Sequence, residues 1–417
     1  MAGTATILKK VPIPVGATAG QTSTVGEPSL ANRGNDLLFS GNWYAASSAN
    51  GGTSWSAINP FTFFPAAAGG FCCDQTLHYD VKNDLAIWLL QYVKAADTNV
   101  LRIAVKKGPF NTPGGWRWWD LGPVQVDPAW VGEWFDYNHA ALSDNFLYVG
   151  TNSFSVADNQ FKRCVVFRIS LASLVAGAQL SISRFSTTNN FSLRCVQGAK
   201  AIMYFASHES NTGRAIRVFS WPENAPTVTS RLVNITAWNP PPFSAPVANG
   251  VNWLQRADGR ITGAALGGAG AGTLSFMWTA AKQGTQRPFP FVRVVQIDAA
   301  TMAVTNQPDI WSGSTAFAYP DACPNANGVV GVTVFSGGGG NNHPAHHVGF
   351  RDDAASQWKL ALATRSTHSP KDQKWGDYLT CRTHSPEGQD WIASGFTLQG
   401  GDQRSNVVPQ YVHFGIR

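Results

Sequence analysis

The sequence predicts an all-β protein, a single seven-bladed β-propeller that spans residues 1–417 and is built from four-stranded antiparallel blades. Three observations support this prediction: the composition, an internal repeat, and the turn residues placed within that repeat. Of the 417 residues, 13% are charged and 12% are aromatic, which argues against disorder. The scarcity of strong helix formers excludes coiled coils and helical solenoids, and no apolar run reaches the ~18 residues of a membrane span.

The repeat recurs about every 60 residues along the chain. Each unit begins with a polar residue in an apolar setting, continues through a turn and ends in a strongly apolar strand. The units begin near Glu27, Asp74, Asp136, Arg194, Asn252, Asp321 and Asp377. A unit of about 60 residues has room for four short strands joined by hairpins. Seven such sheets in succession form a β-propeller.

The strands are clearest in the second unit, where residues 101–105 alternate between apolar and other side chains, as in a half-buried strand. We place the four strands of this unit at 72–79, 85–93, 99–106 and 115–121. Turn dipeptides are expected between the first and second strands of four units, at Asn83-Asp84, Asp144-Asn145, Asp258-Gly259 and Asn327-Gly328. Asn-Gly and Asp-Gly favour tight hairpins because these turns require positive φ.

The last unit offers only three strands, at about 377–384, 389–397 and 408–416. We therefore expect the N-terminal segment near 4–12 to supply the fourth strand, so that the ring closes without a free edge. One helical excursion is expected at Ser170–Gln179. The alternatives are a β-sandwich made of unrelated strands and a propeller with six or eight blades.

Residues 48–55 (Ser-Ala-Asn-Gly-Gly-Thr-Ser-Trp) resemble an Asp-box, the S-x-D-x-G-x-[ST]-[WF] hairpin of the sialidase-like β-propeller superfamily. Asn50 stands where the box usually has Asp, Gly52 permits the backbone reversal, and Trp55 is expected to pack between strands. The resemblance implies a propeller whose relatives hydrolyse glycans, cleave them by lyase chemistry or only bind them. It is not a resemblance to a classical sialidase, because the sequence lacks the R-I-P-type segment of their arginine triad and Arg33 lies in an expected turn.

The formal net charge of +6 suits an anionic partner such as an acidic polysaccharide. Lys9-Lys10 and Lys106-Lys107 are only pairs, so nucleic-acid binding is not expected. We expect a monomer that acts on a glycan or polysaccharide and has no membrane partner. The N-terminus has no signal peptide, and two locations stay open: the cytoplasm, or secretion with the signal already removed.

None of the six cysteines shows C-x-x-C spacing, which argues against a zinc ribbon or a thioredoxin-type site. We expect them to act as small buried hydrophobic residues. The adjacent Cys72 and Cys73 are not expected to bond to each other, because their spacing does not allow ordinary disulfide geometry. One or two other bridges stay open for a secreted protein.

The innermost strand of each blade lines the channel of a propeller, so equivalent positions of the units converge around its axis. The residues that open the seven units are therefore expected to form a ring near one mouth. The polar residues next to this ring are Gln75, Tyr137, His139, Gln197 and Tyr378. Trp134 and Trp375 precede two of the acids and are candidates for the wall of a pocket, and His208 is expected to reach its rim.

Several carboxyl groups at one mouth suggest a catalytic centre, because like charges raise the pKa of at least one of them. Glycoside hydrolysis needs one carboxylic acid and one carboxylate. Lyase cleavage at a uronic acid instead needs a base, His139 or Tyr137, and a cation such as Arg194. The catalytic candidates are Asp74, Asp136, Tyr137, His139, Arg194 and Asp377. The substrate-binding candidates are Glu27, Gln75, Trp134, His208, Asn252, Asp321, Trp375 and Tyr378.

Other roles for the ring stay open. Its oxygens could hold Ca²⁺ in the central channel, although no metal ligand is assigned and no cofactor is certain. Inner-strand polar residues can also serve only to bond neighbouring blades. We favour an enzyme, a glycoside hydrolase or a polysaccharide lyase, because ionisable groups are dense in the predicted ring. The residues that open the units differ, which favours one asymmetric central site, whereas a lectin would repeat similar sites. The alternatives are a non-catalytic glycan-binding propeller and a protein-interaction scaffold.

Overall fold

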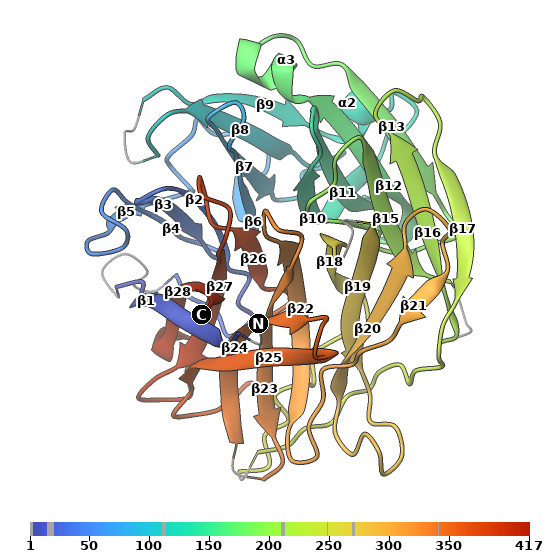
Figure 1. Cartoon of the computed structure of the whole chain (residues 1–417). Coiled ribbons are helices and arrows are strands. Elements are labelled where there is room, and N and C mark those ends of the chain that lie inside the picture. Colours follow the sequence, from blue (N-terminus) through green and yellow to red (C-terminus); the bar gives the residue numbers. More distant parts are fainter. Residues whose placement is uncertain are drawn as a thin grey trace.

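The computed structural model contains seven four-stranded antiparallel sheets arranged as the blades of a β-propeller (Figure 1). It describes residues 3–14, 21–110, 114–209, 213–247, 249–268, 272–340 and 342–417. The predicted seven-bladed, all-β fold is thereby confirmed. The helices in these ranges are short: α2 (Pro123–Val126), α3 (Leu171–Ala176) and the 3₁₀ turn η2 (Arg404–Asn406). None of the helices described is long and apolar enough to cross a membrane.

Blades 1 to 6 are each built from four consecutive strands. Blade 1 contains β2 (Ser29–Arg33), β3 (Asp36–Ser40), β4 (Ala45–Ser48) and β5 (Ser56–Ile58). Blade 2 contains β6 (Phe71–Asp80), β7 (Leu85–Tyr92), β8 (Leu101–Lys107) and β9 (Arg117–Leu121). Blade 3 contains β10 (Glu133–Leu142), β11 (Phe146–Ser155), β12 (Phe161–Ser170) and β13 (Ile182–Thr187).

The next three blades follow the same order. Blade 4 contains β14 (Arg194–Cys195), β15 (Ile202–His208), β16 (Ala215–Pro222) and β17 (Thr229–Asn234). Blade 5 contains β18 (Ile261–Gly267), β19 (Thr273–Ala280), β20 (Phe291–Asp298) and β21 (Val304–Asn306). Blade 6 contains β22 (Ala316–Pro324), β23 (Val330–Gly338), β24 (Asn342–Asp352) and β25 (Gln357–Arg365).

Blade 7 joins the two ends of the chain. It contains β26 (Thr380–Thr383), β27 (Trp391–Leu398), β28 (Val407–Ile416) and, at its outer edge, β1 (Ala5–Pro12). The first pair of this β1–β28 ladder is Ala5 with Ile416, and the termini lie close together in Figure 1. The expected closure of the ring by the N-terminal strand is confirmed.

The first strand of every blade faces the axis. Neighbouring first strands contact one another around the whole ring, from β2 through β6, β10, β14, β18, β22 and β26 back to β2. Because all seven run in the same sense, their N-terminal ends meet at one mouth of the channel and their C-terminal ends at the other. The residues that open the blades therefore belong to one face of the molecule.

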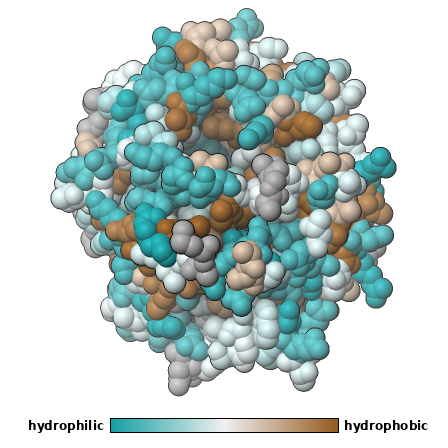
Figure 2. Space-filling model, in the orientation of Figure 1, coloured by the Kyte–Doolittle hydropathy of each residue, from teal (hydrophilic) through white to brown (hydrophobic). Residues whose placement is uncertain are grey.

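Aromatic side chains fill the space between the blades. Six tryptophans are almost completely buried there or beneath the loops: Trp88, Trp221, Trp253, Trp278, Trp375 and Trp391. One apolar cluster contains residues of blades 3, 4 and 5, and another joins blades 6 and 7. Hydrophilic residues predominate on the surface seen in Figure 2, which fits a chain that buries its aromatic residues between sheets.

The strand positions predicted for the second unit and the last unit match blades 2 and 7 within a few residues, and α3 lies within the expected helical excursion. The fifth unit differs. Its inner strand starts only at Ile261, so Asn252 lies in the connection before blade 5, and Asp258-Gly259 precedes β18 instead of following it. The reason is the long Pro-containing connection after β17, which the average repeat length does not anticipate.

Residues 48–55 form the turn between β4 and β5. Ser48 Oγ accepts the Gly52 N–H at 2.8 Å, and Asn50 Oδ1 accepts the Ser54 N–H at 2.9 Å. The Trp55 ring packs edge-on against Phe39. The local hydrogen bonds and the packed ring are those expected from the turn chemistry of this segment.

Cys72 and Cys73 are joined by a disulfide, so the expectation that they would not bond is wrong. Regular pairing of β6 with β7 is interrupted between Phe71 and Gln75. This irregular backbone, instead of a flat strand, brings the neighbouring sulfur atoms together. The other four cysteines, Cys164, Cys195, Cys323 and Cys381, are free and buried, as expected of small apolar side chains.

Candidate active site

A cavity of about 440 Å³ opens where the inner strands begin. Its wall includes Glu27, Asp74, Asp136, Tyr137 and Asp377. Asp74 and Asp136 lie on β6 and β10, whereas Glu27 and Asp377 lie in the segments that lead into β2 and β26. We call this space the acidic cavity. Four of the seven ring positions predicted from the repeat thus meet in one place.

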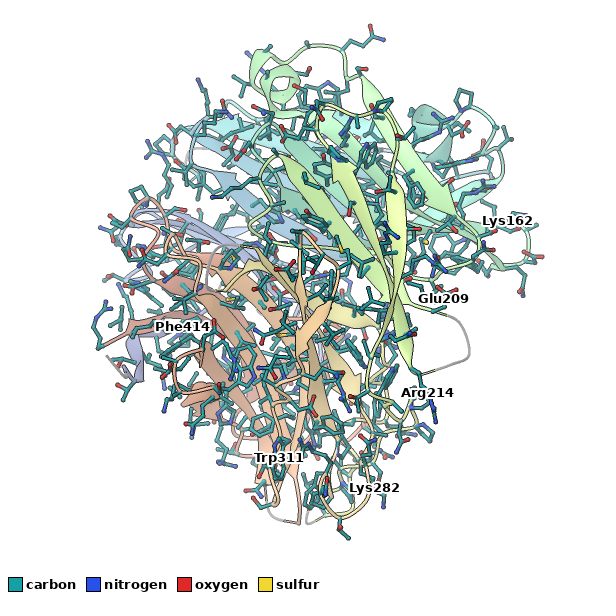
Figure 3. The ribbon with its side chains drawn as sticks, turned by 45° about the vertical axis from the view of Figure 1, so that its right-hand side comes forward. Lys162, Glu209, Arg214, Lys282, Trp311 and Phe414 are labelled. Carbon is teal, nitrogen blue, oxygen red and sulfur yellow. A yellow bond between two sulfur atoms is a disulfide. The ribbon has the colours of Figure 1, made fainter. Side chains whose placement is uncertain are left out.

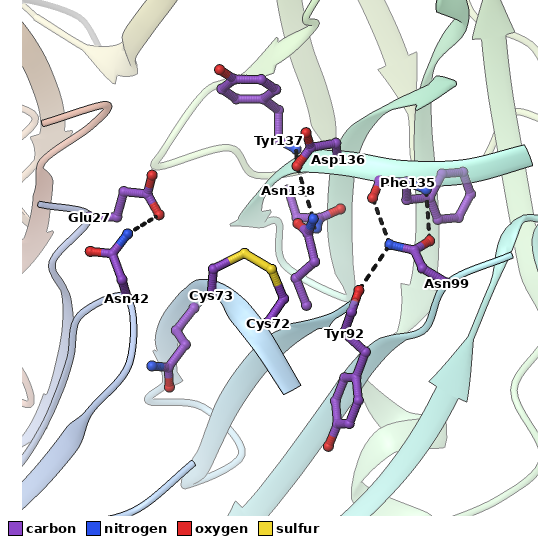
Figure 4. The surroundings of a disulfide bond; sticks show 12 residues. Glu27, Asn42, Cys72, Cys73, Tyr92, Asn99, Phe135, Asp136, Tyr137 and Asn138 are labelled. Atoms are coloured by element: carbon purple, nitrogen blue, oxygen red, sulfur yellow. Dashed lines mark hydrogen bonds between the residues drawn. A yellow bond between two sulfur atoms is a disulfide. The ribbon is translucent and has the colours of Figure 1, made fainter. Parts of the chain in front are cut away.

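Irregular strands aim two of these acids into the cavity. Pairing of β10 with β11 shifts between Asp136 and His139, and Tyr137 within this bulge has a φ of 61°. On β6 the comparable shift contains the Cys72–Cys73 disulfide, directly before Asp74. A bulge re-aims a side chain that strict alternation would place differently. Figure 4 shows the disulfide flanked by Glu27 with Asn42 and by Asp136 with Tyr137.

Glu27 is the most strongly perturbed acid of the cavity. Its side chain is 5% exposed, and burial, followed by the charges of Asp74 and Asp377, raises its pKa well above the usual value. When protonated, Glu27 lies within hydrogen-bonding reach of both of these aspartates. Asn42 Nδ2 donates to Glu27 Oε2 at 2.8 Å. Burial and the two neighbouring aspartates therefore favour the protonated, neutral form of Glu27.

Asp74 is the second carboxyl group of a pair that it forms with Glu27. Burial, and next the charge of Asp136, raise the pKa of Asp74 to about 7. A hydrogen bond from Glu27 acts in the opposite direction and lowers it. Two carboxyl groups in such contact titrate as a pair. The pair of Glu27 and Asp74 therefore keeps a proton to higher pH than two isolated carboxyl groups would.

Asp136 lines the same cavity as this pair, but its carboxyl group accepts a different set of hydrogen bonds. Its Oδ1 accepts hydrogen bonds from Gln91 Nε2 and from the Tyr137 N–H, both at 2.9 Å. Burial raises its pKa, while these two donors oppose that effect. Within the described ranges, Oδ2 accepts no hydrogen bond. Asp136 therefore has a fixed orientation and one oxygen left for a ligand.

Two arginines from the connection before blade 5 contact residues of this wall, and one of them, Arg256, lines the cavity itself. Arg256 makes a two-pronged ion pair with Asp377 through Nε at 3.2 Å and Nη2 at 3.0 Å. Arg260 lies over the Tyr137 ring, 3.4 Å from the ring centre, and pairs with Asp258 at 2.6 Å. Exposed Lys374 and Arg404 line the outer part of the cavity. The deep part is thus acidic, and the exposed lining residues Lys374, Arg404 and Asp372 carry charges of both signs.

Tyr378 lies close to the carboxyl cluster. Burial, and next the charges of Asp74 and Glu27, raise its pKa well above the usual value. Its hydroxyl is buried and bonds to no described group. A neutral phenol in this place can donate a hydrogen bond to the cluster or to a ligand.

Arg194 and Asp321 are not part of the acidic cavity. They pair with each other at 2.8 Å, and Asp321 Oδ2 also accepts the Cys381 N–H at 2.8 Å. Arg382, which lines a separate cavity at the opposite mouth, lies 3.5 Å from the same carboxylate. This group ties blades 4, 6 and 7 together within the channel.

His139 is held by backbone groups on both sides of its ring. Its Nε2 accepts the Cys195 N–H at 3.2 Å, and the ring also bonds the Tyr137 carbonyl. Burial, and next the charge of Arg194, lower its pKa well below the usual value. The imidazole is thus neutral and links blade 3 to blade 4.

The remaining candidates lie outside the acidic cavity. Gln75 is fully buried, and its Nε2 donates to the carbonyls of Gly41 and Tyr44, which bonds blade 2 to blade 1. Asn252 caps its own connection through the Ala245 N–H and the Phe243 carbonyl. The other three are Trp134, which packs on Phe154, Trp375, which is buried, and His208, which lines a second cavity.

Sequence reasoning missed Asn42, Arg256 and Arg260 as site residues. Asn42 follows β3 and Arg256 lies in the long connection, neither of which is a position marked by the repeat. The only available signal was the pair of arginines that flank Asp258. Among the described residues, no group of three or more His, Cys, Asp or Glu side chains is arranged to hold a metal ion.

No family model matches the sequence, and no curated protein matches it significantly. Several solved structures share the general fold. An oligogalacturonate lyase in complex with manganese is 11% identical, with a TM-score of 0.48, and 99% of this chain and 98% of that chain are covered. The GH93 alpha-L-arabinofuranosidase of Fusarium graminearum is 9% identical, with a TM-score of 0.45 and coverage of 99% and 98%.

The Trypanosoma rangeli sialidase is 8% identical to this chain, with a TM-score of 0.42, and 81% of this chain and 53% of that one are covered. These likenesses are too distant to assign an activity to this chain. The resemblance of residues 48–55 to an Asp-box therefore stays a prediction.

Proposed function

We propose that this propeller is a glycoside hydrolase that cleaves a polysaccharide or oligosaccharide in the acidic cavity. The observation that carries the proposal is the meeting of a proton-holding pair, Glu27 and Asp74, with Asp136, a carboxylate that has a free oxygen. A glycosidic bond breaks when a carboxylic acid protonates the leaving oxygen while a second carboxylate acts at the opposite side.

Glu27 is the proposed general acid. As the bond between the anomeric carbon and the leaving oxygen breaks, its electron pair stays on that oxygen, which takes the Glu27 proton. The hydrogen bond from Asn42 Nδ2 to Glu27 Oε2 stabilises the carboxylate that remains. The proton for the next cycle comes from water.

Asp136 is the proposed second carboxylate. The two donors on Oδ1 orient the group and leave Oδ2 for the reaction. As a base, it takes a proton from the water that attacks the anomeric carbon. As a nucleophile, it bonds to the anomeric carbon itself; water then breaks that bond, giving its proton to the Glu27 carboxylate and its oxygen to the sugar. Proton NMR of the first product separates these roles, since the base inverts the anomeric configuration and the nucleophile retains it.

The geometry favours hydrolysis over the lyase alternative. A lyase needs a free base near the substrate and a cation for the uronate carboxylate. Backbone groups occupy both sides of the His139 ring, and Arg194 is paired with Asp321. Tyr137 would have to lose a proton whose pKa burial has raised above its usual value. We therefore expect His139→Gln to keep most of the activity per folded molecule.

The substrate class is a polysaccharide, with acidic chains among the first to test. The cavity volume of about 440 Å³ lies within the range of about 300–1,000 Å³ typical of small-molecule sites. Exposed Lys374 and Arg404 outnumber exposed Asp372 by one charge among the cavity-lining residues, so a neutral and an anionic chain are both tested. Arabinan and oligogalacturonate belong in the panel beside neutral glucans, xylans and mannans.

The test is hydrolysis by the whole chain and by Glu27→Gln, with Glu387→Gln as a matched control on an exposed glutamate. Reducing ends and the ultraviolet absorbance of unsaturated uronates are followed together. We expect reducing ends without new absorbance, a loss of about 10²–10⁴-fold in Glu27→Gln, and full activity in Glu387→Gln. Absorbance that rises with the reducing ends would replace this proposal with a lyase. If the wild type releases no reducing ends and no unsaturated uronates from any substrate of the panel, a glycan-binding propeller is favoured.

A further inference from the structure

A second cavity lies at the same mouth of the propeller, beside the acidic cavity. Its volume is about 680 Å³, and Phe161, Phe191, His208, Trp238 and Arg260 are among its lining residues. Phe161 starts β12 and His208 ends β15, while Phe191 and Arg260 shortly precede the inner strands of blades 4 and 5. All these positions belong to the end of the blades where the inner strands begin. We call this cavity the aromatic groove.

We infer that the aromatic groove binds further neutral sugar residues of the same glycan chain whose scissile bond lies in the acidic cavity. This inference rests on the proposed function only in taking the chain that enters the acidic cavity to be a glycan. The two spaces would then form one extended site across blades 3 and 4.

The first argument is the continuity of the two spaces. Tyr137 lines the acidic cavity and Arg260 lines the groove. The Arg260 guanidinium stacks on the Tyr137 ring at 3.4 Å, so a lining residue of one cavity contacts a lining residue of the other. A chain that leaves the acidic cavity over this pair of side chains enters the groove directly.

The second argument is the aromatic lining. Phe191 is 44% exposed and meets Phe161 edge-on, with ring centres 5.2 Å apart. Trp238 lies under the groove and packs on His208 at 4.7 Å. Aromatic faces pair well with the apolar C–H faces of sugars, while the exposed Asn189 amide offers donors and an acceptor for hydroxyl groups.

The third argument is the absence of free charge among the described residues that line the groove. Glu209 pairs with Arg217 at 2.8 Å, and Arg260 pairs with Asp258 at 2.6 Å. Burial lowers the pKa of His208 to about 4, so this ring is neutral too. Figure 3 shows Glu209 on the same side of the molecule as Lys162, which follows Phe161. Paired charges and aromatic faces fit a neutral ligand better than an anionic one.

The test is equilibrium binding to the Glu27→Gln protein, which is used so that the ligands are not cut. The probes are cello-, xylo- and arabino-oligosaccharides of two and of six residues, with hexagalacturonate as the anionic counterpart. Phe191→Ala, in the same background, is the main variant. Phe61→Ala is its matched control, since Phe61 is 46% exposed, lines neither cavity and meets Phe71 edge-on at 5.1 Å.

We expect at least one neutral hexamer to bind more tightly than its dimer. Phe191→Ala should weaken that hexamer about three- to tenfold, which is the scale of one aromatic contact, and leave the dimer unchanged. Phe61→Ala should change neither. Asn189→Trp, which fills the groove from an exposed position, should weaken the hexamer at least as much.

The inference is overturned if no neutral hexamer binds, if only hexagalacturonate binds, or if Phe191→Ala and Asn189→Trp leave the hexamer affinity unchanged. Hydrolysis by the wild type is measured separately. If the protein hydrolyses glycans but Phe191 is not needed to bind long chains, the inference about the aromatic groove is refuted and the proposed function stands. A protein that binds hexamers through Phe191 but cleaves no substrate refutes the proposed function and supports binding in the aromatic groove.

Discussion

The Asp74→Asn substitution is expected to stabilise the fold at neutral and alkaline pH while it impairs the acidic cavity. Asp74 is held among other carboxyl groups, and its pKa is raised from the usual 3.8 to about 7. An unfolded chain releases this proton above pH ~4, whereas the folded protein releases it only above pH ~7. Folding therefore becomes less favourable as the pH rises between these values.

The size of this effect follows from the shift. At about 1.4 kcal/mol per pKa unit, a raised pKa of this size costs the folded state up to about 4 kcal/mol above pH ~7 and nothing below pH ~4. With an unfolding entropy of roughly 2.1 cal/mol/K per residue, that corresponds to about 5 °C in the thermal midpoint of a chain this long. The neutral amide that Asp74→Asn introduces removes this cost and keeps the volume of the side chain.

The assay is thermal unfolding of the wild type, of Asp74→Asn and of the exposed control Asp97→Asn between pH 4 and pH 8.5. We expect Asp74→Asn to match the wild type at pH 4 and to exceed it by up to about 5 °C at pH 8, with Asp97→Asn close to the wild type throughout. A midpoint of Asp74→Asn that equals or falls below the wild type at pH 8 would refute the raised-pKa account of the carboxyl cluster.

Three further changes test other parts of the site. Asp136→Asn should lower kcat about 10²–10⁴-fold without lowering the thermal midpoint, since the pKa of this carboxyl group is raised as well; activity near the wild-type level would remove Asp136 from the mechanism. Replacing both Cys72 and Cys73 by Ala should lower kcat about tenfold or more, because the disulfide fixes the bulge that aims the next side chain into the cavity; full activity of this double variant would contradict that positioning role. Arg256→Gln should lower the free energy of unfolding by about 1 kcal/mol in urea titrations, since it leaves the largely buried Asp377 without its ion pair; an unchanged midpoint and slope would show that the pair is not stabilising.

The fold could be predicted because its signals are local and repeated. Turn residues such as Asp84, with a φ of 50°, and Gly328, with a φ of 77°, lie between the first and second strands of their blades. Ring closure could be predicted because the last unit lacked a strand and the N-terminal segment 4–12 had the pattern of one. These inferences need only pattern and turn chemistry.

Part of the site could be predicted, namely the residues that lie at or just before the start of an inner strand at a repeat position. Glu27, Asp74, Asp136 and Asp377 meet as expected. Arg194 and Asp321 do not, because whether an inner-strand side chain reaches the mouth depends on bulges and on where each strand begins. A one-residue register shift reverses the direction of a side chain, and the repeat spacing does not reveal it.

Two further features lay beyond sequence reasoning for physical reasons. The Cys72–Cys73 disulfide depends on a local backbone path that no spacing rule describes. Arg256 reaches the acidic cavity, and Arg260 reaches Tyr137 beside it, from a connection that is longer than those before the other blades. Their positions follow from packing rather than from the repeat. Insertions of this kind carry function on propellers because they are free of the sheet register.

The most direct test of the central claim, that Glu27 is the general acid of a glycoside hydrolase, is a leaving-group comparison. It measures kcat/KM of the wild type and of Glu27→Gln on an oligosaccharide that the wild type cleaves and on the dinitrophenyl glycoside of the same sugar. A dinitrophenolate departs without protonation, so the account predicts a loss of about 10²–10⁴-fold on the oligosaccharide and less than about tenfold on the aryl glycoside. Equal losses on both substrates would contradict it.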